Sequence, residues 1–229
     1  LIWSDKLFNG MLIADECHHA SAFTYEQILK TARAKYIYGL TATPTRKDGH
    51  HPILFMHCGP IRYRDDPKKQ AENRPFDHYI VPRFTSLRVP LDSDDKDVSI
   101  QELYADIVDN DFRNQQIIED VLNNYHQGRN CIVLSLRTAH VELLAKKLIE
   151  EVPDVFTLMG GMGKKSTQQA FQRLGDVPAD KNVILVATGH FIGEGFDEPR
   201  LDTLFLAMPI SWKGTLQQYA GRLHRLYKT

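Results

Sequence analysis

Two adjacent carboxylates, Asp15 and Glu16, directly follow the short apolar run Met11–Ala14. A run of this length is typical of a buried strand, and in open α/β sheets ligands bind beyond the carboxyl ends of the strands. Two carboxylates at such a place can divide the work of transferring a phosphoryl group to water. One can hold Mg²⁺ through water, while the other orients or deprotonates the attacking water. A solvated acidic turn is the alternative interpretation of the same pair.

A second polar turn follows the next expected strand, Tyr36–Leu40. It begins with Thr41 and Thr43 and closes with Pro44. Small hydroxyl side chains at this point can hydrogen-bond both to the acidic residues and to a bound backbone. Taken alone the segment indicates only a polar turn, but it follows the acidic strand end by one β/α unit and so supports a ligand site there.

Near the other end of the sequence, Gln218, Arg222 and Arg225 are spaced to share one face of an expected helix over 215–227. Arginine suits a polyphosphate because its guanidinium is planar, always charged and able to bind bidentately. Delivered to a transferring phosphoryl group, it stabilises the charge of the transition state. A solvated basic face is the alternative. Gly221 favours a ligand instead, since glycine inside a helix costs about 1 kcal/mol against alanine.

A glycine-rich loop over 189–197 follows a further expected strand, Val183–Thr188. Glycines let the backbone approach a ligand closely. At the strand end, Thr188 can donate to a nucleic-acid phosphate, while Asp197 can accept from a ribose hydroxyl or from an arginine.

The elements that would position these groups alternate between short apolar runs and periodic segments, which predicts an α/β fold with parallel sheets. A poorly structured stretch over 65–97 separates two domains, which we place at 1–75 and 76–229. The other expected features are a helix over 24–34, loop-like sequence from Thr41 to Pro60, strand-like sequence over 79–89, a capping box at Ser99–Glu102, a helical stripe over 117–125 ending at Gly128, a strand over 131–136, a helix capped by Thr138 and a strand over 203–207.

The composition excludes several classes of protein. With 229 residues, 42% of them hydrophobic, and a net charge of −1, the chain can bury a core and carries no strong global field. Its apolar runs are too short for a membrane helix, and its first residues lack the pattern of a signal peptide. The three cysteines form no disulfide framework, and the histidines lack the spacing of a closed zinc site. We therefore expect a cytoplasmic protein without a membrane partner.

Four of these motifs, taken in order, resemble motifs II, III, V and VI of superfamily 2 helicases of the DEAD/DEAH type. They are Asp-Glu-Cys-His at 15–18, Thr-Ala-Thr at 41–43, Thr-Gly-x5-Gly-Phe-Asp at 188–197 and Gln-x-x-Gly-Arg-x-x-Arg at 218–225. The longer strings over 40–49 and 193–199 are similar to the branch that contains type III restriction subunits and XPB-like proteins. The resemblance implies two RecA-like domains that use ATP and Mg²⁺ to move on nucleic acid, with duplex DNA as the partner.

The resemblance also implies roles for individual residues. They are Asp15 on Mg²⁺, Glu16 as the base or water-orienting group, His18, Thr41 and Thr43 in coupling the nucleotide state to the grip on nucleic acid, Gly195 and Asp197 lining the nucleotide, Gln218 facing the phosphates, Arg222 and Arg225 as arginine fingers, and Ser135, Gly161 and Thr188 beside the nucleic-acid backbone. Cys17 replaces the alanine that is usual in the acidic motif.

One expected motif is absent from the 229 residues, namely the phosphate loop Gly-x4-Gly-Lys-Ser/Thr. The nearest string, at 160–166, fails because Leu158 and Lys165 stand where the template requires glycine and Ser/Thr. We therefore expect a first domain truncated at its N-terminus, a chain inactive alone, and flanking domains such as a nuclease outside it. The alternatives are a nucleic-acid-binding module without hydrolysis and an unrelated metal-dependent hydrolase that uses Asp15, Glu16 and the histidines.

Overall fold

The chain forms two compact units, Leu1–Val81 and Pro82–Thr229, and each is described here by itself. The computed structural model describes residues 10–17, 23–31, 34–41, 51–66, 77, 79–85, 99–189, 198–210, 216, 219–221 and 223. No helix within these ranges is long and apolar enough to cross a membrane. The domain boundary expected between residues 75 and 76 remains a prediction.

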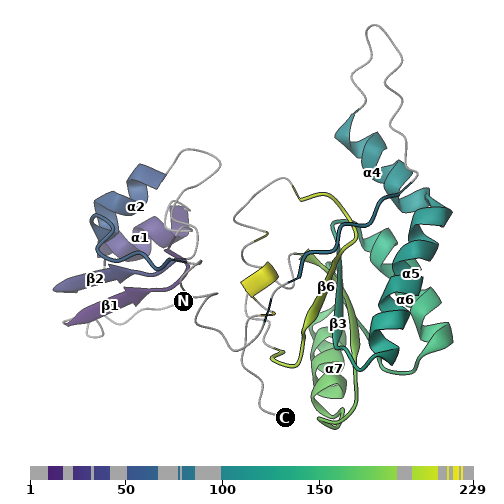
Figure 1. Cartoon of the computed structure of the whole chain (residues 1–229). Helices are drawn as coiled ribbons and strands as arrows, with labels where there is room; N and C mark the ends of the chain where they lie inside the picture. The colour runs from purple at the N-terminus through teal and green to yellow at the C-terminus, as the bar shows by residue number, and fades with distance from the viewer. Residues whose placement is uncertain are drawn as a thin grey trace, which may run out of the picture. The chain divides into compact units, whose positions relative to one another are not determined.

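The first unit is built on two parallel strands, β1 (Met11–Ala14) and β2 (Tyr36–Gly39), with helices α1 (Phe23–Thr31) and α2 (His51–Cys58) (Figure 1). The strands pair in register from Met11 with Tyr36 to Ala14 with Gly39. A small core joins these elements: Leu12, Ala14, Cys17, Leu29, Ile37, Leu54 and Cys58. The expected strands are confirmed, but the loop expected up to Pro60 is wrong where α2 forms. Pro52 lies in the first turn of α2, where proline is tolerated because no N–H is needed there.

The opposite face of this strand pair is apolar and exposed. Met11 and Ile13 of β1 are 57% and 61% exposed, and Tyr36 and Tyr38 of β2, their partners in register, are each 50% exposed. Successive side chains of a strand point to opposite faces, so these four residues form one surface.

The second unit contains a four-stranded parallel sheet in the order β4-β5-β3-β6. Its elements are α4 (Ile100–Asp109), α5 (Asp111–His126), β3 (Cys131–Ser135), α6 (Thr138–Glu151), β4 (Val155–Leu158), α7 (Lys164–Gly175), β5 (Ile184–Thr188) and β6 (Thr203–Leu206). This arrangement confirms the predicted parallel α/β class. Because the strands are parallel, the carboxyl ends of all four lie at one edge of the sheet.

Helices cover both faces of this sheet (Figure 1). Cys131 and Val133 of β3 point into a core shared with α5 and α6, whereas Ile132 and Leu134 point into a second core that includes Leu174 of α7. Successive side chains of β3 thus point alternately into the two cores. Because both faces of the strand are buried, its sequence is a continuous apolar run.

Several helix ends agree with the sequence. Ser99 and Glu102 form a complete capping box at the start of α4, and Gly128 has a φ of +88° just beyond α5. The prediction that Thr138 caps the next helix is wrong. The N-cap of α6 is Arg137, whose backbone is extended at φ −119°, and Thr138 is already the first helical residue.

The strand-like sequence over 79–89 forms no strand in its described part, residues 79–85. Instead, its backbone is fastened to the surface of α5. Arg83 binds Asp120 bidentately at 2.7 and 2.9 Å, and the side-chain amide of Gln116 donates to the carbonyl of Phe84 at 3.3 Å. The chain thus enters the second unit at a fixed point on α5.

Candidate functional site

The acidic pair lies at the carboxyl end of β1, as expected, within a turn of unusual backbone geometry. Glu16 has a φ of +46°, in the left-handed region that side chains other than glycine rarely adopt. Its N–H donates to Oδ1 of Asp15 at 2.8 Å. Non-glycine residues in this region cost about 1–3 kcal/mol and persist where the surrounding structure fixes them, often at functional sites.

Two backbone hydrogen bonds fix this turn to the end of β2. The N–H of Cys17 donates to the carbonyl of Leu40 at 2.9 Å, and the N–H of Leu40 donates to the carbonyl of Ala14 at 2.9 Å. Thr41, the next residue, therefore lies beside the acidic turn. The structure thus brings Asp15, Glu16 and Thr41 to one edge of the strand pair.

Two thiols meet beneath the same turn. A Cβ placed on Gly39 would lie 2.7 Å from Sγ of Cys17 and 3.0 Å from Sγ of Cys58, so only glycine leaves room for the two sulfurs. Burial, together with the neighbouring Cys58 thiol, raises the pKa of Cys17 to about 11. Both thiols stay protonated at neutral pH and act as packing groups, because the thiolate is the reactive form of cysteine.

In the second unit, the expected nucleic-acid residues lie around the carboxyl edge of the sheet. Ser135 ends β3 and Thr188 ends β5, and the two are partners in register. The Oγ1 atom of Thr188 accepts from the N–H of Gly160 at 3.3 Å, which ties β5 to the glycine turn after β4. Gly161 has a φ of +87°, so this turn requires glycine.

Ser135 also belongs to a buried hydrogen-bonded chain that sequence reasoning missed. Its Oγ lies 3.0 Å from Nδ1 of His140, and Nε2 of His140 lies 2.9 Å from Oδ1 of Asn114. Ser135, His140 and Asn114 are at most 1% exposed. Burial, with a smaller effect of the nearby Arg113 cation, lowers the pKa of His140 from 6.5 to about 4.

This shift predicts a pH dependence of stability. Because the folded protein binds the His140 proton less tightly than the unfolded chain, the contribution is complete above pH 6.5 and is lost as the pH falls towards 4. We expect the free energy of unfolding to lose about 3 kcal/mol from this group. Urea unfolding at pH 7 and pH 4.5 measures this loss. In the His140→Gln variant the free energy of unfolding should differ less between the two pH values. An unchanged difference in that variant would show that His140 is not its source.

The C-terminal helical residues dock onto the start of the glycine-rich loop. Tyr219 is 5% exposed, and a Cβ placed on Gly189 would lie 1.8 Å from its hydroxyl oxygen. Burial raises the pKa of Tyr219. Gly221 differs, since a Cβ there would meet no atom of the described residues within 4 Å. The predicted close approach of Gly221 to a ligand remains a prediction.

We expect Gly189→Ala to destabilise the second unit by about 1–3 kcal/mol, the usual cost of overpacking. The added methyl group must displace the ring of Tyr219, which lies 2.8 Å away at its nearest carbon even without the hydroxyl. Chemical denaturation of Gly189→Ala, Tyr219→Phe and the double variant measures the coupling. Tyr219→Phe should recover part of the loss, and strictly additive effects would show that the two residues do not meet.

A second feature missed in the sequence is a buried ion pair just after the glycine-rich loop. Arg200 is 8% exposed and binds Glu198 bidentately, with distances of 2.8 Å and 3.0 Å. The same guanidinium donates to the carbonyls of Leu174 and Val177 at 2.9 and 3.2 Å. It thereby joins Glu198 to the end of α7. The sequence Glu198-Pro199-Arg200 does not indicate that the pair is buried, because the carbonyl partners of Arg200 come from a distant part of the chain.

The remaining predicted site residues lie outside the described residues, or have side chains outside them: His18, Thr43, Gly195, Asp197, Gln218, Arg222 and Arg225. Their roles remain predictions. Across the described ranges, no group of three or more His, Cys, Asp or Glu side chains gathers to hold a metal ion.

Two protein families match the chain. The family described as type III restriction enzyme, res subunit, matches residues 4–46, and the helicase conserved C-terminal domain matches residues 113–227, half of the chain. Among curated proteins, the putative ATP-dependent RNA helicase L396 of Acanthamoeba polyphaga mimivirus is 25% identical over 97% of this chain and 42% of its own length. The probable helicase D10 of Escherichia phage T5 is 22% identical over 96% of this chain and 46% of its own length.

A shorter match joins the chain to the DNA 3'-5' translocase XPB2 of Sulfurisphaera tokodaii, which is 39% identical over 61 residues, 27% of this chain and 14% of that protein. Among solved structures, T4 UvsW is similar with a TM-score of 0.46 and 18% identity, over 94% of this chain and 42% of that one. The chain spans less than half the length of these relatives.

The parallel sheet, with helices on both faces and polar groups gathered at its carboxyl edge, defines the second unit as a RecA-like α/β domain. The chain belongs to the superfamily 2 helicases that carry the helicase conserved C-terminal domain. The resemblance to the branch with type III restriction subunits and XPB-like proteins is confirmed.

Proposed function

We propose that this chain contributes the catalytic and nucleic-acid-binding groups of an ATP-dependent helicase or translocase that acts on duplex DNA. The observation that carries the proposal is the acidic turn at the end of β1. This turn is joined by backbone hydrogen bonds to Leu40, the residue before Thr41, at the edge where a parallel α/β sheet binds its ligands. The matches to helicase families support the same function.

In this proposal Asp15 holds Mg²⁺ and Glu16 orients or deprotonates the attacking water. The exposed carboxylate of Asp15 fits the metal, because Mg²⁺ takes oxygen ligands and is usually held by one or two carboxylates together with water and substrate phosphates. Bound Mg²⁺ would neutralise charge that develops on the phosphates of ATP. Gln218, Arg222 and Arg225 would contact the phosphates, and Gly195 and Asp197 the nucleoside, as the family resemblance implies.

The test is nucleic-acid-stimulated hydrolysis of ATP by the complete gene product. We expect turnover to rise on adding duplex DNA, and less on adding single-stranded DNA or RNA. Stimulation by RNA alone would make the DNA assignment wrong. The RNA measurement is needed because the mimivirus relative is described as a putative RNA helicase. Absence of turnover with every nucleic acid would contradict the proposal as a whole.

A second candidate, a nucleic-acid-binding module that does not hydrolyse ATP, is favoured by the absence of Gly-x4-Gly-Lys-Ser/Thr from the 229 residues. Both candidates predict that the 229-residue chain alone shows no appreciable ATPase activity, because it has no loop to cradle the β- and γ-phosphates. A coupled ATPase assay measures this. Robust turnover that Glu16→Gln abolishes would refute the prediction.

A further inference from the structure

The buried hydrogen bonds that link Asn114, His140 and Ser135 allow only one assignment of donors and acceptors. The side-chain Nδ2 of Asn114 donates to the carbonyl of Val108 at 2.7 Å, so Oδ1 is the atom of Asn114 that faces His140. An amide oxygen only accepts, and therefore Nε2 of His140 must carry the proton. The tautomer of His140 is thus set by an amide whose own orientation is fixed.

The direction of the remaining bonds follows from this tautomer. A neutral imidazole has one N–H, so Nδ1 of His140 is an acceptor, and the hydroxyl of Ser135 donates to it at 3.0 Å. The same hydroxyl oxygen accepts the N–H of Arg137 at 3.2 Å. The one proton of Ser135 therefore points into the protein, and it is not available to a phosphate oxygen.

The arrangement of serine, histidine and amide could suggest a nucleophile with its base, but the surroundings exclude that function. Ser135 is 1% exposed and His140 0%, so no substrate carbonyl could reach the hydroxyl. Attack also requires a base that gains a proton, and a histidine buried beside the cation Arg113 is a weak one.

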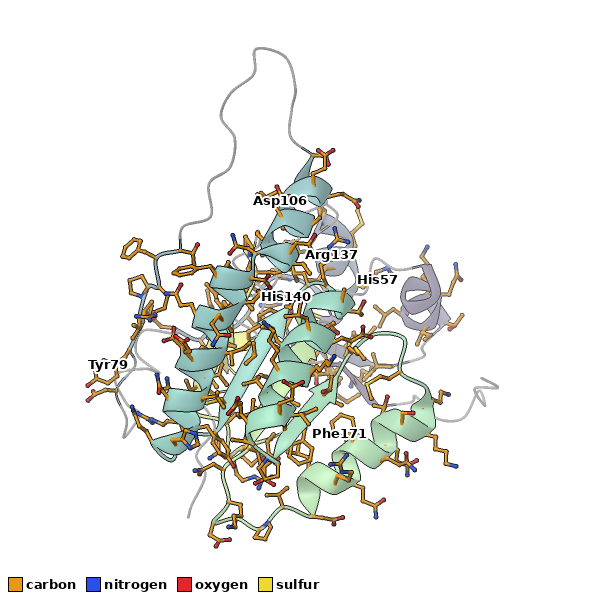
Figure 2. The ribbon with its side chains drawn as sticks, turned by 90° about the vertical axis from the view of Figure 1, so that its right-hand side faces the viewer. His57, Tyr79, Asp106, Arg137, His140 and Phe171 are labelled. Carbon is orange, nitrogen blue, oxygen red and sulfur yellow. The ribbon has the colours of Figure 1, made fainter. Side chains whose placement is uncertain are left out.

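Arg137, whose backbone N–H donates to Ser135, is half-buried. Arg137, labelled in Figure 2, is the N-cap of α6, and no side chain caps that helix. Its guanidinium lies 5.3 Å from the centre of the Tyr104 ring. No ion pair joins it to a carboxylate within the described part of the chain.

We propose that His140 and Asn114 are positioning residues for a nucleic-acid phosphate contact made by Arg137, with Ser135 as the link. The fixed amide orients His140, His140 orients the hydroxyl of Ser135, and this oxygen holds the backbone of Arg137 at the end of β3. Tyr104 supports the guanidinium from α4. The inference rests on the nucleic-acid binding of the proposed function and assigns to Arg137 the contact expected of Ser135.

The experiment measures binding of the 229-residue chain to a fluorescein-labelled 20-base-pair DNA duplex by anisotropy, between 50 and 200 mM NaCl. We expect Arg137→Ala to lower the affinity and to reduce the slope of log K against log salt by about 0.9, the value for one phosphate contact. Arg129→Ala is the matched control. Arg129 precedes β3, at the opposite edge, and lies 3.8 Å from Asp202, so its removal should leave the slope unchanged.

Ser135→Ala and His140→Leu test the positioning role. Each should lower the affinity about twofold or more in the wild-type background, and neither should lower it further in the Arg137→Ala background, because coupled residues are non-additive. Ser135→Thr should retain binding. Ser135→Ala removes only a hydroxyl, so it remains informative if His140→Leu fails to fold, which thermal unfolding will reveal.

The possible outcomes separate the two proposals. Equal losses in both backgrounds, or a slope unaffected by Arg137→Ala, would overturn the positioning role while leaving nucleic-acid binding intact. Failure of the wild-type chain to bind the duplex at any salt concentration would instead count against the proposed function. Long-range ¹H–¹⁵N NMR should show the Nε2–H tautomer of His140, and the Nδ1–H tautomer would overturn the inference.

Discussion

Replacing Glu16 by Gln in the complete gene product is expected to lower the rate of ATP hydrolysis by about 10²–10⁴-fold, the usual contribution of a general base. Glutamine has nearly the same shape as glutamate but cannot take a proton from water. The turn that carries the side chain should survive, because its hydrogen bond is made by the backbone N–H of Glu16 to Asp15. Binding of ATP should therefore be largely retained.

Single-turnover hydrolysis and nucleotide binding, measured separately, test this expectation. Asp15→Asn should weaken the binding of Mg²⁺–ATP as well as the rate, since it removes the proposed ligand of the metal. Asp106→Asn, on an exposed position of α4, is a control that removes one carboxylate and should change neither quantity. Equal losses of binding and rate in Glu16→Gln would mean that Glu16 contributes uniformly to binding and is not the base.

Replacing Glu198 by Ala is expected to destabilise the second unit by about 1.5–3 kcal/mol, the usual contribution of hydrogen bonds to a charged group, because Glu198 accepts two hydrogen bonds from the buried guanidinium of Arg200. The side chains of Arg200 and Glu198 are 7% and 10% exposed, so water cannot replace the lost carboxylate. The same guanidinium donates to the carbonyl of Leu174, in the last turn of α7, and to that of Val177 just beyond the helix, so the change also weakens the support of this helix end.

The more exposed pair of Arg83 and Asp120 provides a matched comparison. It is also bidentate, but the side chain of Arg83 is 56% exposed, so Asp120→Ala should cost no more than about 1 kcal/mol. Native-state hydrogen exchange of the β3 and β5 amides reports the stability of this unit without interference from the other. Similar losses in the two variants would show that burial does not determine the strength of the Arg200 pair.

Elements with a strong local signal could be predicted from the sequence. Met11–Ala14 is a short apolar run that ends in carboxylates, and the capping box at Ser99 and Glu102 specifies a helix start through two reciprocal hydrogen bonds. Gly128 was identifiable because a left-handed residue beyond a helix favours glycine. In each case the deciding interaction lies within a few residues of sequence.

Other elements could not be predicted because their signal comes from distant parts of the chain. Helix α7 consists mostly of polar residues and buries only Leu174, so the apolar stripe on its surface is too small to identify the helix from the sequence. Strand β4 has four residues and follows Pro153, and it is stabilised by pairing with β5. The partners of His140 and Arg200 are likewise set by the tertiary fold, so their spacing in the sequence reveals nothing of them.

The apolar face formed by Met11, Ile13, Tyr36 and Tyr38 has a practical consequence for all these measurements. Contiguous exposed apolar surface promotes adhesion between molecules, and a short strand pair also offers edges on which other strands can add. Solubility of the 229-residue chain should therefore be limited by its first unit, and light scattering should rise with concentration. The substitutions Ile13→Lys and Tyr38→Thr should raise the solubility of the chain. Both side chains lie on the face of the strand pair opposite the small core, so these changes leave the core intact.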